Sequence, residues 1–119
     1  MNHKSQNTYH QHLKELIDSY VDQVYHVTKK FPKDELFAAT SQFRRATLSV
    51  ALNYIEGYAR QRSAVLKNFL EISYGSLKES EYLIEFGYRQ QYIIEADFKE
   101  LRQKANEIGA MLYSITSKL

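Results

Sequence analysis

Cysteine and tryptophan are absent from this sequence of 119 residues, which contains only one proline and four glycines. The lack of cysteine excludes disulfides, thiolate metal sites and a cysteine nucleophile. Proline and glycine disfavour helices most, so their scarcity leaves room for long helices. No apolar run approaches the ~20 residues of a membrane-spanning helix. The first residues, MNHKSQNTYHQH, do not resemble a signal peptide, and we expect a cytoplasmic protein without membrane contact.

Apolar and aromatic side chains are plentiful instead: 44% of the residues are hydrophobic and ten are tyrosines. A domain of this length buries roughly two thirds of its unfolded surface, which is enough for a core without cross-links. The net charge of +2 is unevenly distributed, with +4 in residues 42–67 and −4 in residues 68–100. The total charge does not predict nucleic-acid binding, but the local excess of +4 is large enough for a nucleic-acid-binding surface.

Two stretches, at residues 9–31 and 95–115, carry apolar side chains at alternating steps of three and four, as amphipathic helices do. The first is predicted to end at Pro32, because proline lacks an N–H group and disfavours helical geometry in the residue before it. The predicted core residues are Leu13, Ile17, Tyr20, Val24, Val27 and Phe31 in the first helix and Phe98, Leu101, Ala105, Ile108, Leu112 and Ile115 in the last.

The stretch from Thr40 to Arg62 predicts a second helix of a different kind. Between Ala46 and Ile55 its residues are apolar or small around most of the circumference, which predicts burial on more than one side. Thr40 and Ser41 either cap a separate helix or lie within one longer helix. This helix therefore carries more apolar surface than one bundle core needs.

A third helix is predicted from Ser63, a residue type that favours the N-cap position, to about Gly87. Glycine inside a helix costs ~1 kcal/mol relative to alanine, so Gly75 predicts the close approach of a neighbouring helix. Gly57, near the end of the second helix, is the other predicted close-packing position.

Four amphipathic helices with short connections predict an all-α fold, an antiparallel up-down-up-down four-helix bundle. The bundle is expected to cover residues 9–119, and residues 1–8 are expected to be a disordered N-terminus. No strand-like alternation and no internal repeat competes with this prediction.

The histidines raise the question of a metal site. His10 and His12 are two residues apart, so on a helix they point to different faces, and no histidine is followed by an acid at i+4. We interpret His3, His10, His12 and His26 as solvated or packing residues. A phosphate loop, a nucleophile elbow, a zinc-protease motif and a Glu-x-x-His pair are also missing. We therefore expect no enzyme, no catalytic residue, no metal and no cofactor.

Asn53 and Glu56 are polar residues inside the apolar part of the second helix. Asn53 lies either on a narrow exposed edge or in a buried position where its hydrogen bond fixes the register. Glu56 precedes Arg60 by four residues, the spacing of a surface ion pair worth ~0.3 kcal/mol. Alternatively, Glu56 is buried and pairs with Arg44, Arg45 or an arginine of another subunit. Both residues are candidate structural or interface positions.

Basic residues lie near both ends of the second helix, and we name them the basic set: Arg44, Arg45, Arg60, Arg62 and Lys67. They form a solvated face, or they pair with the acidic third helix of a neighbouring chain, or they contact the phosphates of a nucleic acid. In the last case, Tyr54, Tyr58 and Tyr74 are available for stacking on bases.

Several short motifs, in this order, carry a likeness to a known family: Phe31-Pro32, Thr40-Ser41-Gln42, Arg44-Arg45-Ala46, Ser49, Asn53 and Glu56-Gly57. They resemble the signature of bacterial four-helix-bundle proteins encoded by intervening sequences of 23S rRNA genes, the S23-like family. Phe69-Leu70 and Gly75-Ser76-Leu77 are similar to the third helix of that family. The chain departs from the family pattern at Ala51, where proline is common.

The resemblance implies a homo-oligomeric ring, a homopentamer, and similar pentameric bundles bind a reverse transcriptase and nucleic acid in diversity-generating retroelements. The first hypothesis is therefore a non-enzymatic oligomer that binds RNA or another nucleic acid through the basic set. The alternative is a protein–protein adaptor or scaffold, whose charged surfaces serve ring assembly and whose tyrosines face a protein partner.

Overall fold

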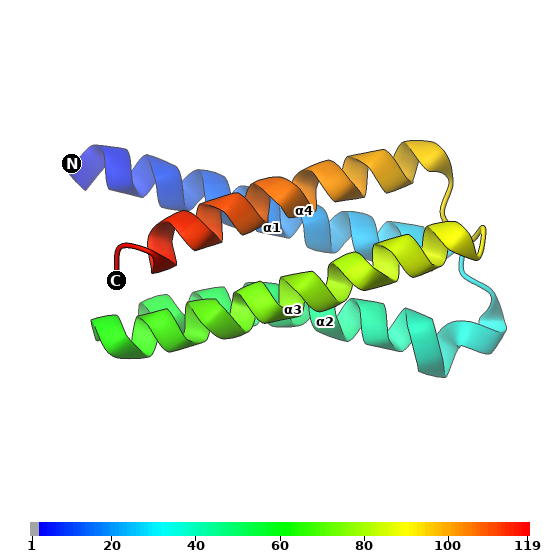
Figure 1. The fold of residues 1–119 in the computed structure, drawn as a ribbon, viewed down its shortest axis with the longest axis horizontal. Coiled ribbons are helices and arrows are strands. Elements are labelled where there is room, and N and C mark those ends of the chain that lie inside the picture. Colours follow the sequence, from blue (N-terminus) through cyan, green and yellow to red (C-terminus); the bar gives the residue numbers. More distant parts are fainter. Residues whose placement is uncertain (1–2) are drawn as a thin grey trace.

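The computed structural model describes the backbone of residues 3–119 and the side chains of residues 8–119. Its long helices run alternately up and down (Figure 1). Their bounds are α1 His3–Thr28, α2 Ser41–Ala59, α3 Ser63–Arg89 and α4 Glu95–Thr116. The described backbone contains no strand. The predicted all-α, up-down-up-down four-helix bundle is confirmed.

Each helix packs against two others: α1 and α3 both contact α2 and α4, and the most extensive contact joins α2 to α3. The bundle measures 47 × 24 × 19 Å. We name the end that holds both chain termini and the α2–α3 connection the terminal end, and the opposite end the linker end (Figure 1). Over the described range, none of the helices combines the length and hydrophobicity that a bilayer crossing needs.

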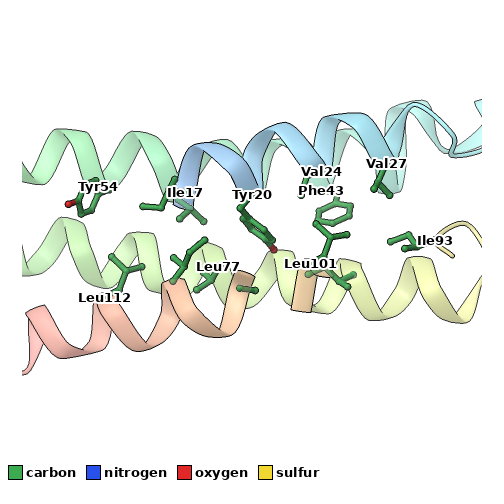
Figure 2. Close-up of a cluster of buried hydrophobic side chains, with 14 of the residues drawn as sticks. Ile17, Tyr20, Val24, Val27, Phe43, Tyr54, Leu77, Ile93, Leu101 and Leu112 are labelled. Carbon is green, nitrogen blue, oxygen red and sulfur yellow. The ribbon is translucent and has the colours of Figure 1, made fainter. Parts of the chain in front are cut away.

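The core lies between the four helices, where the apolar seams meet (Figure 2). All the predicted core residues of α1 are buried, and so are those in the middle of α4, whereas Phe98 and Ile115 are partly buried. Each fully buried apolar side chain contributes about 1.5–3 kcal/mol. The buried hydroxyl of Tyr20 lies 2.7 Å from Ser80 Oγ, which itself donates to the Leu77 carbonyl. This polar group is therefore satisfied within the core.

The α1–α2 connection is a compact turn rather than a continuation of either helix. A short turn, η1 (Lys33–Glu35), leads into a wider one, η2 (Leu36–Thr40), where Ala38 has φ −124° and ψ −105°. The long-helix interpretation is therefore wrong, because the backbone leaves helical geometry before Ser41. The capped interpretation is also incomplete, since no side chain forms a cap hydrogen bond at the start of α2.

The helix bounds differ from the sequence expectation at two N-termini. The described backbone is helical from His3, ahead of residue 9. Disorder was expected for residues 1–8. Most of the side chains in this range lie outside the described residues, so this expectation stays a prediction. Ser63 is the first residue of α3, and Arg62 occupies the N-cap position without a capping hydrogen bond. The expected Ser63 cap is therefore wrong, and α3 begins without this local stabilisation.

Two glycines expected at close contacts have different surroundings. A Cβ atom on Gly57 would lie 3.1 Å from Leu66 Cδ1 and 3.1 Å from Phe69 Cβ, so α2 and α3 approach closely there. A Cβ atom on Gly75 would meet nothing within 4 Å, and Gly75 is exposed. The close approach expected at Gly75 is not formed within this chain, because Gly75 lies on the outward side of α3.

Candidate functional site

The basic set does not form one cluster. Arg44 and Arg45 lie near the start of α2, at the linker end, whereas Arg60, Arg62 and Lys67 surround the α2–α3 connection at the terminal end. Arg44 and Arg60 are separated by about 24 Å along the helix, at ~1.5 Å per residue. In one chain, a single short nucleic-acid contact therefore cannot use all five residues.

Arg44 is part of the bundle structure. Its Nε donates to Thr28 Oγ1 at 2.8 Å, and its Nη2 donates to the Tyr25 carbonyl at 3.5 Å. The guanidinium also lies over the Tyr25 ring, 4.7 Å from its centroid. A cation at the C-terminal end of α1 interacts favourably with the helix dipole. Arg44 therefore ties α2 to the last turn of α1 and has little capacity left for a phosphate.

Arg45 has different surroundings although it is the next residue. It is exposed and has no ion pair among the described residues. It lines an open hollow of about 460 Å³ together with Phe37 and Tyr82. Phe37 is 93% exposed, which is unusual for a large apolar side chain. The linker end therefore presents an aromatic surface beside one unpaired arginine.

At the terminal end, Glu56 and Arg60 form the local ion pair that their spacing predicts. Arg60 Nη2 lies 2.6 Å from Glu56 Oε1, and both side chains are about half exposed. The guanidinium also lies over Phe69, 5.7 Å from the ring centroid. Within this chain, Glu56 therefore forms the surface ion pair with Arg60. It does not pair with Arg44, which binds Thr28 instead.

Arg62 and Lys67 are the unpaired cations of the basic set at this end. Both are exposed, and neither has an ion pair with any residue that the structure describes. Because Arg60 is neutralised by Glu56, these two residues carry most of the positive charge around the α2–α3 connection. They are free to contact an external anion without breaking an internal bond.

The terminal end also contains a cleft that the sequence did not predict. It has a volume of about 380 Å³ and is lined by Tyr9, His10, Tyr58, Leu66, Ser114, Ile115, Lys118 and Leu119. Its residues come from both ends of the sequence and from the α2–α3 region, so no local motif signals it. The Tyr9 hydroxyl donates to the Met111 carbonyl at 3.0 Å, which links α1 to α4 beside the cleft.

His10 belongs to a group of aromatic side chains beside this cleft. Its Nδ1 lies 3.1 Å from the Tyr54 hydroxyl, and its ring meets the Tyr58 ring edge-on with centroids 4.6 Å apart. Burial lowers the pKa of His10 below its ordinary value of 6.5. Burial also raises the pKa of Tyr58 to about 12. At neutral pH the imidazole is therefore neutral and the phenol keeps its proton.

The outward side of α2 carries an apolar stripe that this chain leaves uncovered. Leu48, Leu52 and Ile55 are 36%, 61% and 48% exposed, and Ile72 of α3 is 44% exposed beside them. We name these four residues the outer stripe. The expectation that the second helix is buried on more than one side is therefore not met within a single chain, since its second apolar side faces outward.

Asn53 lies between the core and this outward side. Its Nδ2 donates to the Ser49 carbonyl and to Ser49 Oγ, both at 2.9 Å, and Ser49 Oγ lies 2.7 Å from Ser76 Oγ. Asn53 is half-buried. Asn53 is thus neither fully exposed nor fully buried. A chain of hydrogen bonds links Asn53 through Ser49 to Ser76 of α3.

The remaining histidines lie apart from one another. His12 Nε2 is 3.2 Å from Glu107 Oε1 of α4, and His26 is exposed. The side chain of His3 is outside the described residues. Among residues 8–119, no group of three or more His, Asp or Glu side chains is arranged to hold a metal ion.

Sequence comparison places this bundle in a family. The model of the 23S rRNA-intervening sequence protein family matches residues 11–114. The chain belongs to this family. The match covers all four helices of the bundle, which agrees with the resemblance of the α2 motifs. The family description specifies no enzymatic activity.

Among solved structures, the chain is similar to a protein of unknown function from the S23 ribosomal protein family of Bacteroides thetaiotaomicron VPI-5482. The TM-score is 0.81 at 24% identity, and the alignment covers 87% of this chain and 97% of that one. At this identity the likeness establishes the family fold alone. No curated protein matches the chain.

Proposed function

We propose that the chain is a non-enzymatic, homo-oligomeric bundle of the cytoplasm that binds RNA or another nucleic acid at the terminal end. The observation that carries the proposal is the pair of unpaired cations, Arg62 and Lys67, beside a cleft lined with aromatic rings. Cations that track phosphates and aromatic rings that stack on bases are the two components of single-stranded nucleic-acid sites.

Assembly into a ring, with five copies as the family resemblance implies, is the second part of this proposal. The outer stripe supports it, because Leu48, Leu52 and Ile55 repeat at steps of four and three on one helix face. Soluble chains rarely leave such a continuous apolar face in water.

Light scattering tests the assembly. The wild-type protein is expected to have the mass of an oligomer, and Leu52→Glu is expected to have the mass of a folded monomer, because a carboxylate in a dry interface is costly. Ala110→Glu, at an exposed position on α4, is the matched control and should remain oligomeric. A monomeric wild-type protein would exclude the ring.

Titration with RNA tests the binding. Affinity is expected to fall as salt rises, and Arg62→Gln with Lys67→Gln is expected to lower the slope of log K against log salt by about 0.7 per lost contact for a single strand. Lys29→Gln with Lys30→Gln removes the same charge at the linker end and should change little. The proposal fails if RNA does not bind at low salt, or if both double variants behave alike.

The protein–protein adaptor remains the second candidate function, and the linker end favours it. Phe37 and Leu36 are 93% and 49% exposed there, and Tyr82 beside them is 59% exposed. An exposed aromatic at the tip of a turn is a typical anchor for a protein partner. Charge reversal at Arg60 and Arg62 separates the two candidates: loss of the oligomer with intact RNA binding supports the adaptor, and the opposite result supports the nucleic-acid site.

A further inference from the structure

The cleft at the terminal end has polar groups with no partner in the described structure. Tyr58, Ser114 and Lys118 are among its lining residues, and neither the two hydroxyls nor the ammonium has a hydrogen bond or ion pair with a described residue. His10 uses Nδ1 for Tyr54, which leaves Nε2 without a partner. The cleft can therefore donate and accept hydrogen bonds to a ligand, from several directions at once.

The side chains that line the cleft favour an anion. They include Lys118 and no Asp or Glu. A neighbouring hollow of about 220 Å³ is lined by Arg62 and shares Tyr58 and Leu66 with the cleft. A second cationic side chain is therefore next to the cleft. A divalent metal ion is a poor ligand for this site, because the lining offers cations and no carboxylate side chain.

The shape of the cleft favours a flat ring of modest size. The rings of Tyr9, His10 and Tyr58 contribute to its lining, with Leu66 and Ile115 as apolar neighbours. Its volume of about 380 Å³ is near the lower end of the ~300–1,000 Å³ range of ligand pockets. A nucleobase combines an aromatic face, an edge of donors and acceptors, and an attached phosphate, so it satisfies the rings, the unpaired hydroxyls and Lys118 together.

We propose that this cleft binds a single unpaired nucleobase, with its phosphate held by Lys118. The inference deepens the proposed function and rests on it for the nature of the ligand. A base of this kind comes either from a free nucleotide or from an unpaired position of an RNA strand. In both cases the base stacks on the His10 ring, while its edge bonds to the Ser114 and Tyr58 hydroxyls.

The probes are adenosine, AMP, UMP and a short unstructured RNA, titrated against the full chain by calorimetry. Ser114→Phe fills the cleft and is expected to weaken AMP and UMP roughly tenfold or more, the loss expected for one stacked base. Ser19→Phe makes the same change at an exposed position in the middle of α1 and should have no effect. Circular dichroism before titration checks that both variants keep the helical content of the wild type.

Lys118→Gln separates the phosphate from the base. This substitution is expected to weaken the binding of AMP several-fold and to leave the binding of adenosine unchanged, because adenosine has no phosphate. Lys30→Gln, at the linker end, is the matched control for charge. Tyr58→Phe removes one hydroxyl while keeping the ring, and is expected to weaken all the nucleotide probes modestly.

The outcomes distinguish the inference from the proposed function. If no nucleotide binds and Ser114→Phe leaves RNA binding unchanged, the cleft inference is wrong, while the role of Arg62 and Lys67 in RNA binding can still stand. If nucleotides bind in the cleft and RNA does not bind at all, the free nucleotide is the source and the proposed function fails. If Ser114→Phe weakens the binding of both RNA and AMP, an unpaired position of the RNA strand is the source of the bound base.

Discussion

The two ends of the bundle differ in how completely their side chains are engaged. At the linker end, the Phe31 ring packs at a tilt against the Tyr92 ring with centroids 5.2 Å apart, and the Tyr92 hydroxyl donates to Glu35 at 3.0 Å. At the terminal end, the Tyr58 hydroxyl and the Lys118 ammonium have no partner within the described residues. Satisfied groups stabilise the fold, and unsatisfied ones are available to a ligand. The groups around Phe31 and Tyr92 therefore stabilise the linker end, and the unpaired groups around Tyr58 are the ones to which we assign the proposed ligand.

The largest expected change in stability comes from a substitution that disturbs the packing of the linker end. In Gly87→Ala, the new Cβ atom would lie 2.6 Å from Ile93 Cδ1 and 3.1 Å from Phe31 Cζ, so the buried Ile93 side chain must move. Overpacking of this kind costs about 1–3 kcal/mol of the free energy of unfolding. Urea denaturation measures it. Gly75→Ala, with open space around the new atom, is the control and should be neutral or stabilising by up to ~1 kcal/mol.

A smaller effect distinguishes Arg44 from Arg45. Arg44→Gln removes the charged hydrogen bond to Thr28 and the contact with the Tyr25 ring, and is expected to cost about 1–2 kcal/mol in chemical denaturation. Arg45→Gln, at the adjacent exposed position, should change stability by less than ~0.5 kcal/mol. Equal losses for the two variants would show that Arg44 is not the structural tie described above.

The connections at the two ends offer a matched pair of substitutions. Gln61 at the terminal end has φ 62° and Gln91 at the linker end has φ 66°. Residues other than glycine pay ~1 kcal/mol or more in this conformation, whereas glycine does not. Gln91→Gly and Gln61→Gly are each expected to raise the free energy of unfolding by up to ~1 kcal/mol. A decrease in either melting temperature would contradict this account of the turns.

The smallest effect is a pH dependence at the terminal end. The pKa of His10 is lowered by burial, so the unfolded chain binds this proton at higher pH than the folded chain does. The contribution of neutral His10 to stability is therefore complete above about pH 6.5 and declines as the pH falls below that value. Tyr58 lines the same cleft, and burial raises its pKa to about 12, so its hydroxyl keeps its proton throughout this range.

Denaturation curves between about pH 5 and pH 8 measure this dependence. His10→Gln is expected to flatten it, and His26→Gln, which changes an exposed histidine at the other end of α1, should leave it unchanged. Identical pH profiles for the two variants would remove His10 from the account.

The periodicity of α1 and α4 was a sufficient basis for predicting much of the fold. Their seams are local patterns, and the side chains from Leu13 to Val27 are buried as the pattern requires. The α1–α2 connection was left open, because Thr40 and Ser41 suit a cap and a helix interior equally. The close approach predicted at Gly75 is not formed within one chain, because a mid-helix glycine does not reveal which side of the helix it faces.

Less of the candidate site could be predicted. The basic set was found by its charge, but its division between the two ends follows from the length of α2, and the engagement of Arg44 depends on Thr28 of another helix. The cleft was missed altogether, because Tyr9 and Lys118 lie at opposite ends of the sequence. No spacing rule connects residues that only the antiparallel closure of α1 against α4 brings together.

The sequence by itself determined the helices, their order, the core seams and the family, since each depends on residues a few positions apart or on a run of short motifs. Tertiary structure alone decided which cations are free, which glycine is enclosed and where a cleft opens. The physical reason is that partners across a bundle are chosen by the packing of whole helices. An unpaired hydroxyl or ammonium is recognisable only when every neighbour that might have satisfied it is in place.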